Sequence, residues 1–100
     1  MPTDVEIADG QIQKGMKLLD DGAEDDWIDR IDEEKLDLYS ICNCVLGQTF
    51  GDFGEALEEL GISYAKAVEF GFSIDGDNEA SWDLLLSRWV KAIGARKGLA

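Results

Sequence analysis

The stretch YSICNCVLGQTFGDFGEAL, Tyr39–Leu57, decides the fold class of this 100-residue chain. Ser40 is a residue type favoured at a helix N-cap, and Gly51 suits the position just after a helix C-terminus. The residues between them therefore predict a helix over about 41–50. This helix is apolar on nearly every side, which is typical of a helix at the centre of a domain, and Gly47 is expected to lie at a close helix crossing.

Residue types that favour helix ends predict two more short helices in the same way. Asp52, followed by Glu55 three residues later, forms a capping box that opens a helix over about 53–60. Ser63 is the expected N-cap of a further helix over about 64–70. A glycine closes each of the two, and three short helices in succession favour an all-α fold.

A longer helix is predicted near each end of the chain. Apolar residues at helical spacing indicate a helix over about 7–19 and a stronger amphipathic helix over about 79–94, with Asp77 or Asn78 as its N-cap. One or two short helical turns are expected between the first helix and the central one. Large apolar residues of the central and last helices are expected to anchor the core: Val45, Leu46, Trp82, Leu86 and Trp89.

These elements predict a single all-α domain over residues 1–100, because a chain of this length leaves no room for a second domain. About five short helices surround the central helix and the C-terminal amphipathic helix. Residues 1–6 are expected to be disordered, and residues 95–100 are expected to be frayed.

The composition favours a packed domain that remains in the cytosol. Hydrophobic residues make up 45% of the chain, and 22 acids against 9 bases give a net charge of −13. Binding to nucleic acid or to an anionic membrane needs clustered lysine and arginine, so neither is expected as a direct partner. The N-terminus lacks the features of a signal peptide, and no apolar run reaches the roughly 18 residues of a membrane span.

The two cysteines, Cys42 and Cys44, are expected to be reduced and packed. On the predicted helix they point about 200° apart, so they cannot share a metal ion or form a disulfide with each other. The chain contains no histidine, which removes the commonest general base and leaves too few ligands for a zinc site. No metal, no cofactor and no enzymatic activity are therefore expected.

An acidic run from Asp20 to Asp37 is the strongest charge feature of the chain. It holds ten acids against two bases, and Trp27 and Ile28 are expected to turn inward from among them. The run could contact a basic protein surface, imitate a nucleic acid, or serve only solubility. Leu84, on the side of the last helix opposite its apolar stripe, is a competing apolar contact. The acids predicted to form a partner-binding face are Asp20, Asp21, Glu24, Asp25, Asp26, Asp29, Glu33 and Glu34.

A pattern of spaced residues runs through the same region: W-x-x-x-I-[DN]-x-x-x-L-[DN]-[LM]-x-S, then C-V-L-G-Q-x-[FY]-G, then G-F and a terminal helix containing tryptophan. It falls on Trp27, Ile31, Asp32, Leu36, Asp37, Leu38, Ser40, Cys44, Val45, Leu46, Gly47, Gln48, Phe50, Gly51, Gly71, Phe72 and Trp89. By this pattern the chain resembles a family of small proteins encoded by mycobacteriophages and other actinobacterial phages, over about residues 27–93. The chain departs from the pattern at DDWIDR, where Pro-Gly would precede the tryptophan.

The resemblance implies a phage protein in the cytoplasm of a bacterial host, and it implies no particular activity. The leading hypothesis is a non-enzymatic phage accessory protein, monomeric or weakly homodimeric, that binds a host or phage protein with a basic surface. The alternatives are an acidic nucleic-acid mimic that sequesters a DNA-binding protein, and a virion or assembly component.

Overall fold

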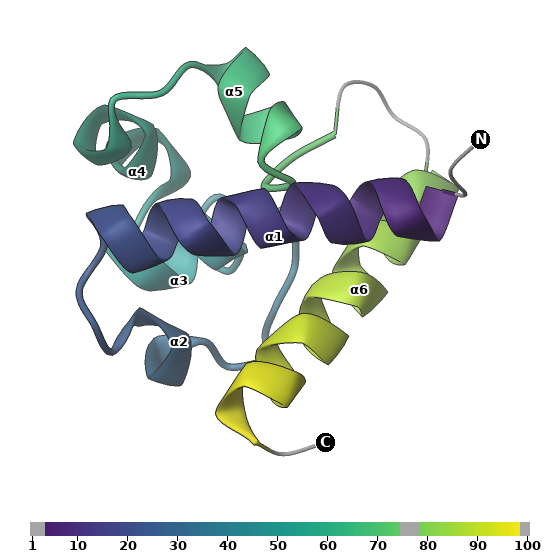
Figure 1. Ribbon diagram of the computed structural model, residues 1–100. Helices are drawn as coiled ribbons and strands as arrows, with labels where there is room; N and C mark the ends of the chain where they lie inside the picture. The colour runs from purple at the N-terminus through teal and green to yellow at the C-terminus, as the bar shows by residue number, and fades with distance from the viewer. Residues whose placement is uncertain (1–3, 75–78, 99–100) are drawn as a thin grey trace.

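The computed structural model describes residues 4–74 and 79–98 of the chain. Within these ranges every regular element is an α-helix, and the helices form a single small domain (Figure 1). The all-α fold class predicted from the sequence is therefore confirmed. In chain order the helices are α1 Asp4–Gly22, α2 Trp27–Arg30, α3 Val45–Phe50, α4 Phe53–Leu60, α5 Tyr64–Glu69 and α6 Glu79–Lys97.

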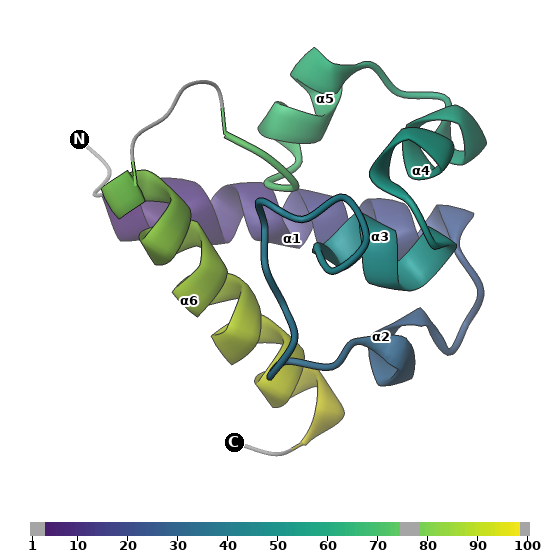
Figure 2. The same ribbon diagram turned by 180° about the vertical axis from the view of Figure 1, so that it is seen from behind.

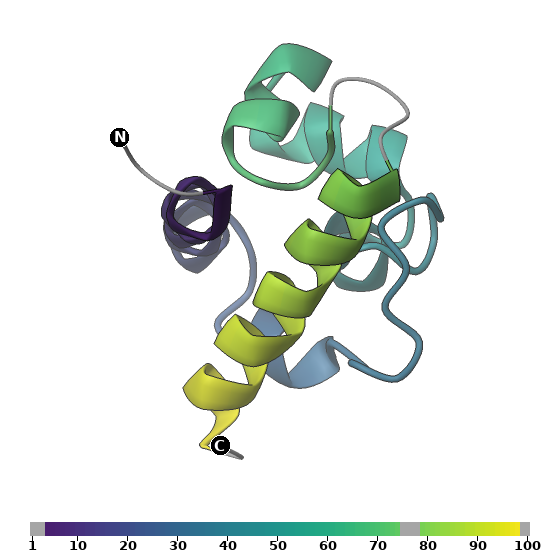
Figure 3. The same ribbon diagram turned by 90° about the vertical axis from the view of Figure 1, so that its right-hand side faces the viewer.

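The two long helices, α1 and α6, cross and pack against each other (Figures 1 and 3). Beside their apolar stripes, the guanidinium of Arg88 on α6 donates to both carboxylate oxygens of Asp9 on α1, at 2.7 Å each. A bidentate pair of this kind fixes the orientation of one helix on the other. The buried residues are Ala8, Ile12, Gly15, Met16 and Leu19 on α1, and Trp82, Leu85, Trp89 and Ile93 on α6.

The segment after α5 packs directly on α1 because two glycines allow it. A Cβ atom on Gly15 would collide with the carbonyl oxygen of Phe70 and lie 3.1 Å from the ring of Phe72. Gly71 has a φ of 79°, which glycine adopts without strain. Its carbonyl oxygen accepts a hydrogen bond from Nε1 of Trp89 at 2.7 Å, and the rings of Phe72 and Trp89 stack. Trp89 thus joins α6 to the segment after α5, and that segment packs on α1.

The short helix α3 connects several segments in the middle of the molecule. It packs against α4 and α2, and α2 also contacts α6 (Figure 2). Val45 and Leu46 are almost fully buried. The side chain of Gln48 accepts a hydrogen bond from the amide of Asp32 at 2.6 Å and donates to the carbonyl oxygens of Asp32 and Asn43. The acidic loop after α2 is thereby tied to α3.

The central helix is shorter than the sequence predicts. It begins at Val45, because Cys44 has extended backbone and its Sγ accepts a hydrogen bond from the amide of Gly47 at 3.2 Å, as an N-cap side chain does. Ser40 instead caps a separate turn, since its Oγ accepts the amides two and three residues further on. This turn leaves Cys42 exposed and Cys44 buried, so the prediction of two packed thiols is wrong for Cys42.

Two core predictions also change. A Cβ atom on Gly47 would collide with the carbonyl oxygen of Ile41 and lie 2.6 Å from the carbonyl carbon of Cys42. The lack of a side chain at Gly47 therefore allows the turn before α3, and not another helix, to pack closely against α3. Leu86 is only partly buried, and its neighbour Leu85 lies in the core instead.

The remaining differences concern helix ends. Helix α1 runs from Asp4 to Gly22, so residues 4–6 are helical rather than disordered. Helix α6 continues to Lys97, so residues 95–97 are helical rather than frayed. Helix α4 has the predicted bounds, and α5 ends one residue before the predicted end. The predicted N-cap of the last helix, Asp77 or Asn78, lies outside the described residues.

Over residues 4–74 and 79–98, no helix combines the length and the apolarity needed to cross a membrane.

Candidate interaction surface

One groove on the surface gathers large apolar side chains that are exposed. We call it the Tyr39 groove, and its volume is about 400 Å³. Three residues at its edge expose large parts of their surface: Tyr39 58%, Ile41 61% and Tyr64 49%. No charged side chain lines it among the described residues. Its lining comes from the loop before α3, from α4, α5 and α6, and from the chain after α5: Leu38, Tyr39, Ser40, Ile41, Cys44, Phe53, Tyr64, Ser73, Ile74 and Trp82.

The loop before α3 presents Tyr39 and Ile41 because local hydrogen bonds hold it away from helical geometry. A carboxylate oxygen of Asp37 accepts the amide of Tyr39 at 2.9 Å, and Ser40 caps the turn that follows. The Tyr39 ring also lies against the ring of Trp82, with 4.4 Å between their centroids. An exposed aromatic side chain is therefore held in one orientation.

Tyr64, which also lines the groove, is likewise held by contacts within the protein. Its hydroxyl is hydrogen-bonded to Oγ of Ser73 at 3.1 Å and donates to the carbonyl oxygen of Ile74 at 3.0 Å. Its ring meets the ring of Phe53 edge-on, at 6.4 Å between centroids. Both tyrosines are thus positioned by contacts within the protein and still present an exposed face.

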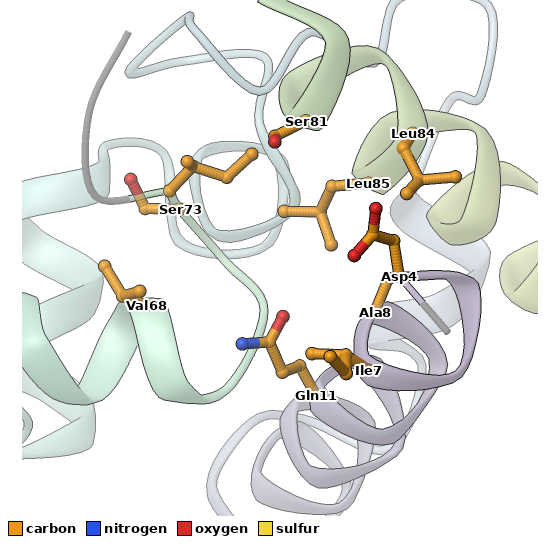
Figure 4. A pocket seen from close by; sticks show the side chains of 10 residues that line it. Asp4, Ile7, Ala8, Gln11, Val68, Ser73, Ser81, Leu84 and Leu85 are labelled. Atoms are coloured by element: carbon orange, nitrogen blue, oxygen red, sulfur yellow. The ribbon is translucent and has the colours of Figure 1, made fainter. Parts of the chain in front are cut away.

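A second groove lies between α1, α5 and α6, with a volume of about 590 Å³ (Figure 4). It shares Ser73 and Ile74 with the Tyr39 groove. Leu84 lies in its wall beside Leu85 and opposite Ile7 of α1, and Leu84 is only partly exposed. Leu84 therefore lines a groove beside α1, and its role as an apolar contact for a partner stays a prediction.

The predicted acidic face is partly neutralised by bases of the protein itself. A first group of its acids forms ion pairs: Asp20 with Arg96, Glu24 and Asp26 with Arg30, and Glu33 with Lys97. A second group is exposed and forms no ion pair within the described part of the chain: Asp21, Asp25, Asp29 and Glu34. Trp27 turns inward as predicted, with 1% of its surface exposed, and its Nε1 donates to Asp20. Half of the proposed acids are therefore already paired with bases of the same chain.

The two ion pairs between α1 and α6 lower the pKa values of Asp9 and Asp20. The guanidinium of Arg88 lowers the pKa of Asp9 below its ordinary 3.8, and burial opposes the shift. The guanidinium of Arg96, helped by the indole N–H of Trp27, lowers the pKa of Asp20 in the same way. Both carboxyls therefore stay ionised wherever the protein is folded near neutral pH.

Cys44 borders the Tyr39 groove but is only 2% exposed. Burial raises the pKa of its thiol, so the thiol is protonated near neutral pH. Across the described ranges, no group of three or more cysteines, aspartates and glutamates is placed to hold a metal ion.

The exposed residues of the Tyr39 groove were not predicted as a site. The sequence DLYSICNC contains Asp37, Ser40 and Asn43 within seven residues, and these residue types favour turns over helix. That signal indicates a turn in which Tyr39 and Ile41 face solvent.

Comparisons with protein-family models, with curated proteins and with solved structures found no match.

Proposed function

We propose that this chain is a non-catalytic binding protein that engages another protein through the Tyr39 groove. The observation that carries the proposal is the exposure of Tyr39, Ile41 and Tyr64, between 49% and 61%, around one apolar groove. Tyrosine is enriched at the centres of protein interfaces because it offers a large contact area with few rotatable bonds.

The fixed orientation of the two tyrosines supports this proposal. Side chains that are already ordered lose little conformational freedom on binding, so more of the contact energy appears as affinity. Tyr39 is held by Trp82, and Tyr64 is held by Ser73 and Ile74. The resemblance to small actinobacteriophage proteins favours a target among bacterial host or phage proteins.

The acidic face remains the second candidate, as a contact for a basic protein or as an imitation of nucleic acid. It is favoured by the exposure of Asp21, Asp25, Asp29 and Glu34 without ion pairs in the described residues. The pairing of the other four acids weakens it, because a contact there would compete with bases of the same chain.

The test is quantitative capture from a mycobacterial lysate with matched variants as baits. We expect Ile41→Glu to lose the proteins that the parent captures. We expect Val90→Glu to keep them, because Val90 is 37% exposed on α6 and lines neither groove. Circular dichroism of each bait shows that it is folded.

Two results contradict the proposal. Loss of the captured protein with Asp25→Lys/Asp29→Lys, but not with Ile41→Glu, assigns binding to the acidic face. A mass that rises with concentration in light scattering, and that Ile41→Glu abolishes, assigns the groove to a second copy of the same chain and favours an assembly component.

A further inference from the structure

We infer that the Tyr39 groove takes a partner segment in which an apolar side chain is flanked by lysine or arginine. This inference rests on the proposed function, and it adds the chemistry of the partner. The apolar side chain of the partner is inferred from the residues that line the groove. The lysine or arginine beside it is inferred from the charges around the groove.

Among the described residues, no charged side chain lines the groove. Most of its lining side chains are aromatic or aliphatic, the others are Ser40, Cys44 and Ser73, and the hydroxyl of Tyr64 is already bonded to Ser73 and Ile74. A volume of about 400 Å³ accommodates a large apolar side chain. Burying such a side chain against Trp82 and Phe53 is favourable because it removes apolar surface from water.

Three acids stand next in sequence to residues of this lining, and the carboxylates of two of them are held by local hydrogen bonds. Asp37 precedes Leu38, and its carboxylate accepts the amide of Tyr39. Asp52 precedes Phe53, and its carboxylate accepts the amide of Glu55 at 3.1 Å as the N-cap of α4. A third carboxylate, that of exposed Asp83, follows Trp82 on α6.

Few bases of the segments that form the groove offset these acids. Residues 38–74 contain five acids and one base, Lys66, and that base pairs with Glu69 at 3.0 Å. On α6, three of the four bases, Arg88, Arg96 and Lys97, form ion pairs with acids of α1 and of the loop after α2, and exposed Lys91 forms none among the described residues. The surroundings of the groove are therefore negative, which favours a partner with a positive rim and opposes an acidic one.

The experiment selects binders from a random twelve-residue peptide library displayed on particles, with the immobilised full chain as bait. Ile41→Glu is the counter-bait, so only peptides that need the groove are kept. We expect these peptides to share an apolar residue flanked by lysine or arginine. Their affinity is then measured by fluorescence anisotropy at low and high salt.

The matched variant for the charge is Asp37→Asn/Asp52→Asn. Asparagine keeps the turn and the N-cap that these carboxylates make, so the fold is retained while two charges are removed. We expect the selected peptides to bind this variant roughly 2- to 30-fold more weakly at low salt, as the loss of two exposed charge pairs implies. We expect the difference to shrink at high salt, where exposed charges are screened.

Three outcomes overturn the inference. Groove-dependent peptides that are neutral or acidic refute the basic flank and leave the proposed function standing. Removal of all basic peptides by the Ile41→Glu counter-bait shows general attraction to an acidic chain. A selection that yields no peptide separating the parent from Ile41→Glu rules out a short segment as the occupant, while an Ile41-dependent protein captured from lysate would still support the proposed function.

Discussion

Cys42 and Cys44 stand two residues apart, but only Cys42 is exposed. Burial raises the pKa of Cys44, and its Sγ accepts the amide of Gly47, so its reactive thiolate is scarce and shielded. We expect one thiol per native chain to react quickly with a chromogenic thiol reagent near neutral pH, and the second to react after denaturation. Cys42→Ser should abolish the fast phase. Two fast thiols in the parent would contradict the burial of Cys44.

The CVLGQ stretch, Cys44–Gln48, contributes to the fold at each residue. Cys44 caps α3, Val45 and Leu46 fill the core, and Gly47 admits the preceding turn. Gln48 forms two hydrogen bonds with Asp32 in the loop after α2 and a third with Asn43 in the turn before α3. The exposed residues proposed to bind a partner lie just before this stretch, so the recognisable motif positions the surface and is not part of its exposed edge.

At the scale of the helix, the close approach of α3 to its own preceding turn is open to a direct test. Gly47→Ala places a Cβ atom against the backbone of Ile41 and Cys42, which cannot move aside as a side chain would. We expect a loss of roughly 1–3 kcal/mol in the free energy of unfolding, measured by urea denaturation. Because the turn carries Ile41, groove-dependent binding should weaken as well.

The matched control is Gly10→Ala on α1. Nothing lies within 4 Å of a Cβ atom at Gly10, so the substitution adds helix propensity without a clash. We expect it to stabilise the protein by roughly 0.5–1 kcal/mol. Equal effects of the two substitutions would mean that Gly47 is not in close contact with the turn.

Helices whose ends are set by local capping could be predicted from the sequence. Asp52 and Ser63 cap α4 and α5 through bonds to the amides three residues on, and both helices begin where predicted. The start of α3 could not be predicted from the sequence, because its N-cap is a buried cysteine, and cysteine is not a residue type that marks helix starts. That single error concealed the exposed turn before α3, and with it one edge of the groove.

The candidate site was harder to predict than the helix ends, because it depends more on tertiary structure. Charge density in the sequence indicated the acidic run, but Arg96 and Lys97 are distant in the chain and neutralise Asp20 and Glu33 only in the folded protein. The Tyr39 groove combines the loop before α3 with α4, α5 and α6, and no local pattern states that these segments meet.

For the whole molecule, Trp89 is the residue on which the packing of separate segments depends most directly. It is fully buried, stacks on Phe72 and donates to the carbonyl oxygen of Gly71. Truncation of a buried aromatic residue costs roughly 3–5 kcal/mol, a large share of the stability of a domain of this size. We expect Trp89→Ala to be unfolded or nearly so by circular dichroism. Val90→Ala, at an exposed neighbouring position, should melt within a few degrees of the parent.

The ion pairs that hold α1 to α6 make stability depend on pH in a defined direction. Pairing with Arg88 and Arg96 lowers the pKa values of Asp9 and Asp20 below their ordinary 3.8. A carboxyl with a depressed folded-state pKa contributes stability above its unfolded-state pKa, and loses that contribution as pH falls through the folded-state value. The contribution of both pairs should therefore be complete near neutral pH and disappear below about pH 4.

Net charge complicates the measurement, because removing any acid from a chain of net charge −13 also relieves self-repulsion. The control for Asp9→Asn/Asp20→Asn is therefore Asp21→Asn/Asp25→Asn, which removes two exposed carboxylates that form no ion pair among the described residues. We expect the first variant to melt at a lower temperature than the second near neutral pH, and the two melting temperatures to converge as the pH falls below about 4. A gap that stays constant over this range would show that the two ion pairs do not stabilise the crossing of α1 and α6.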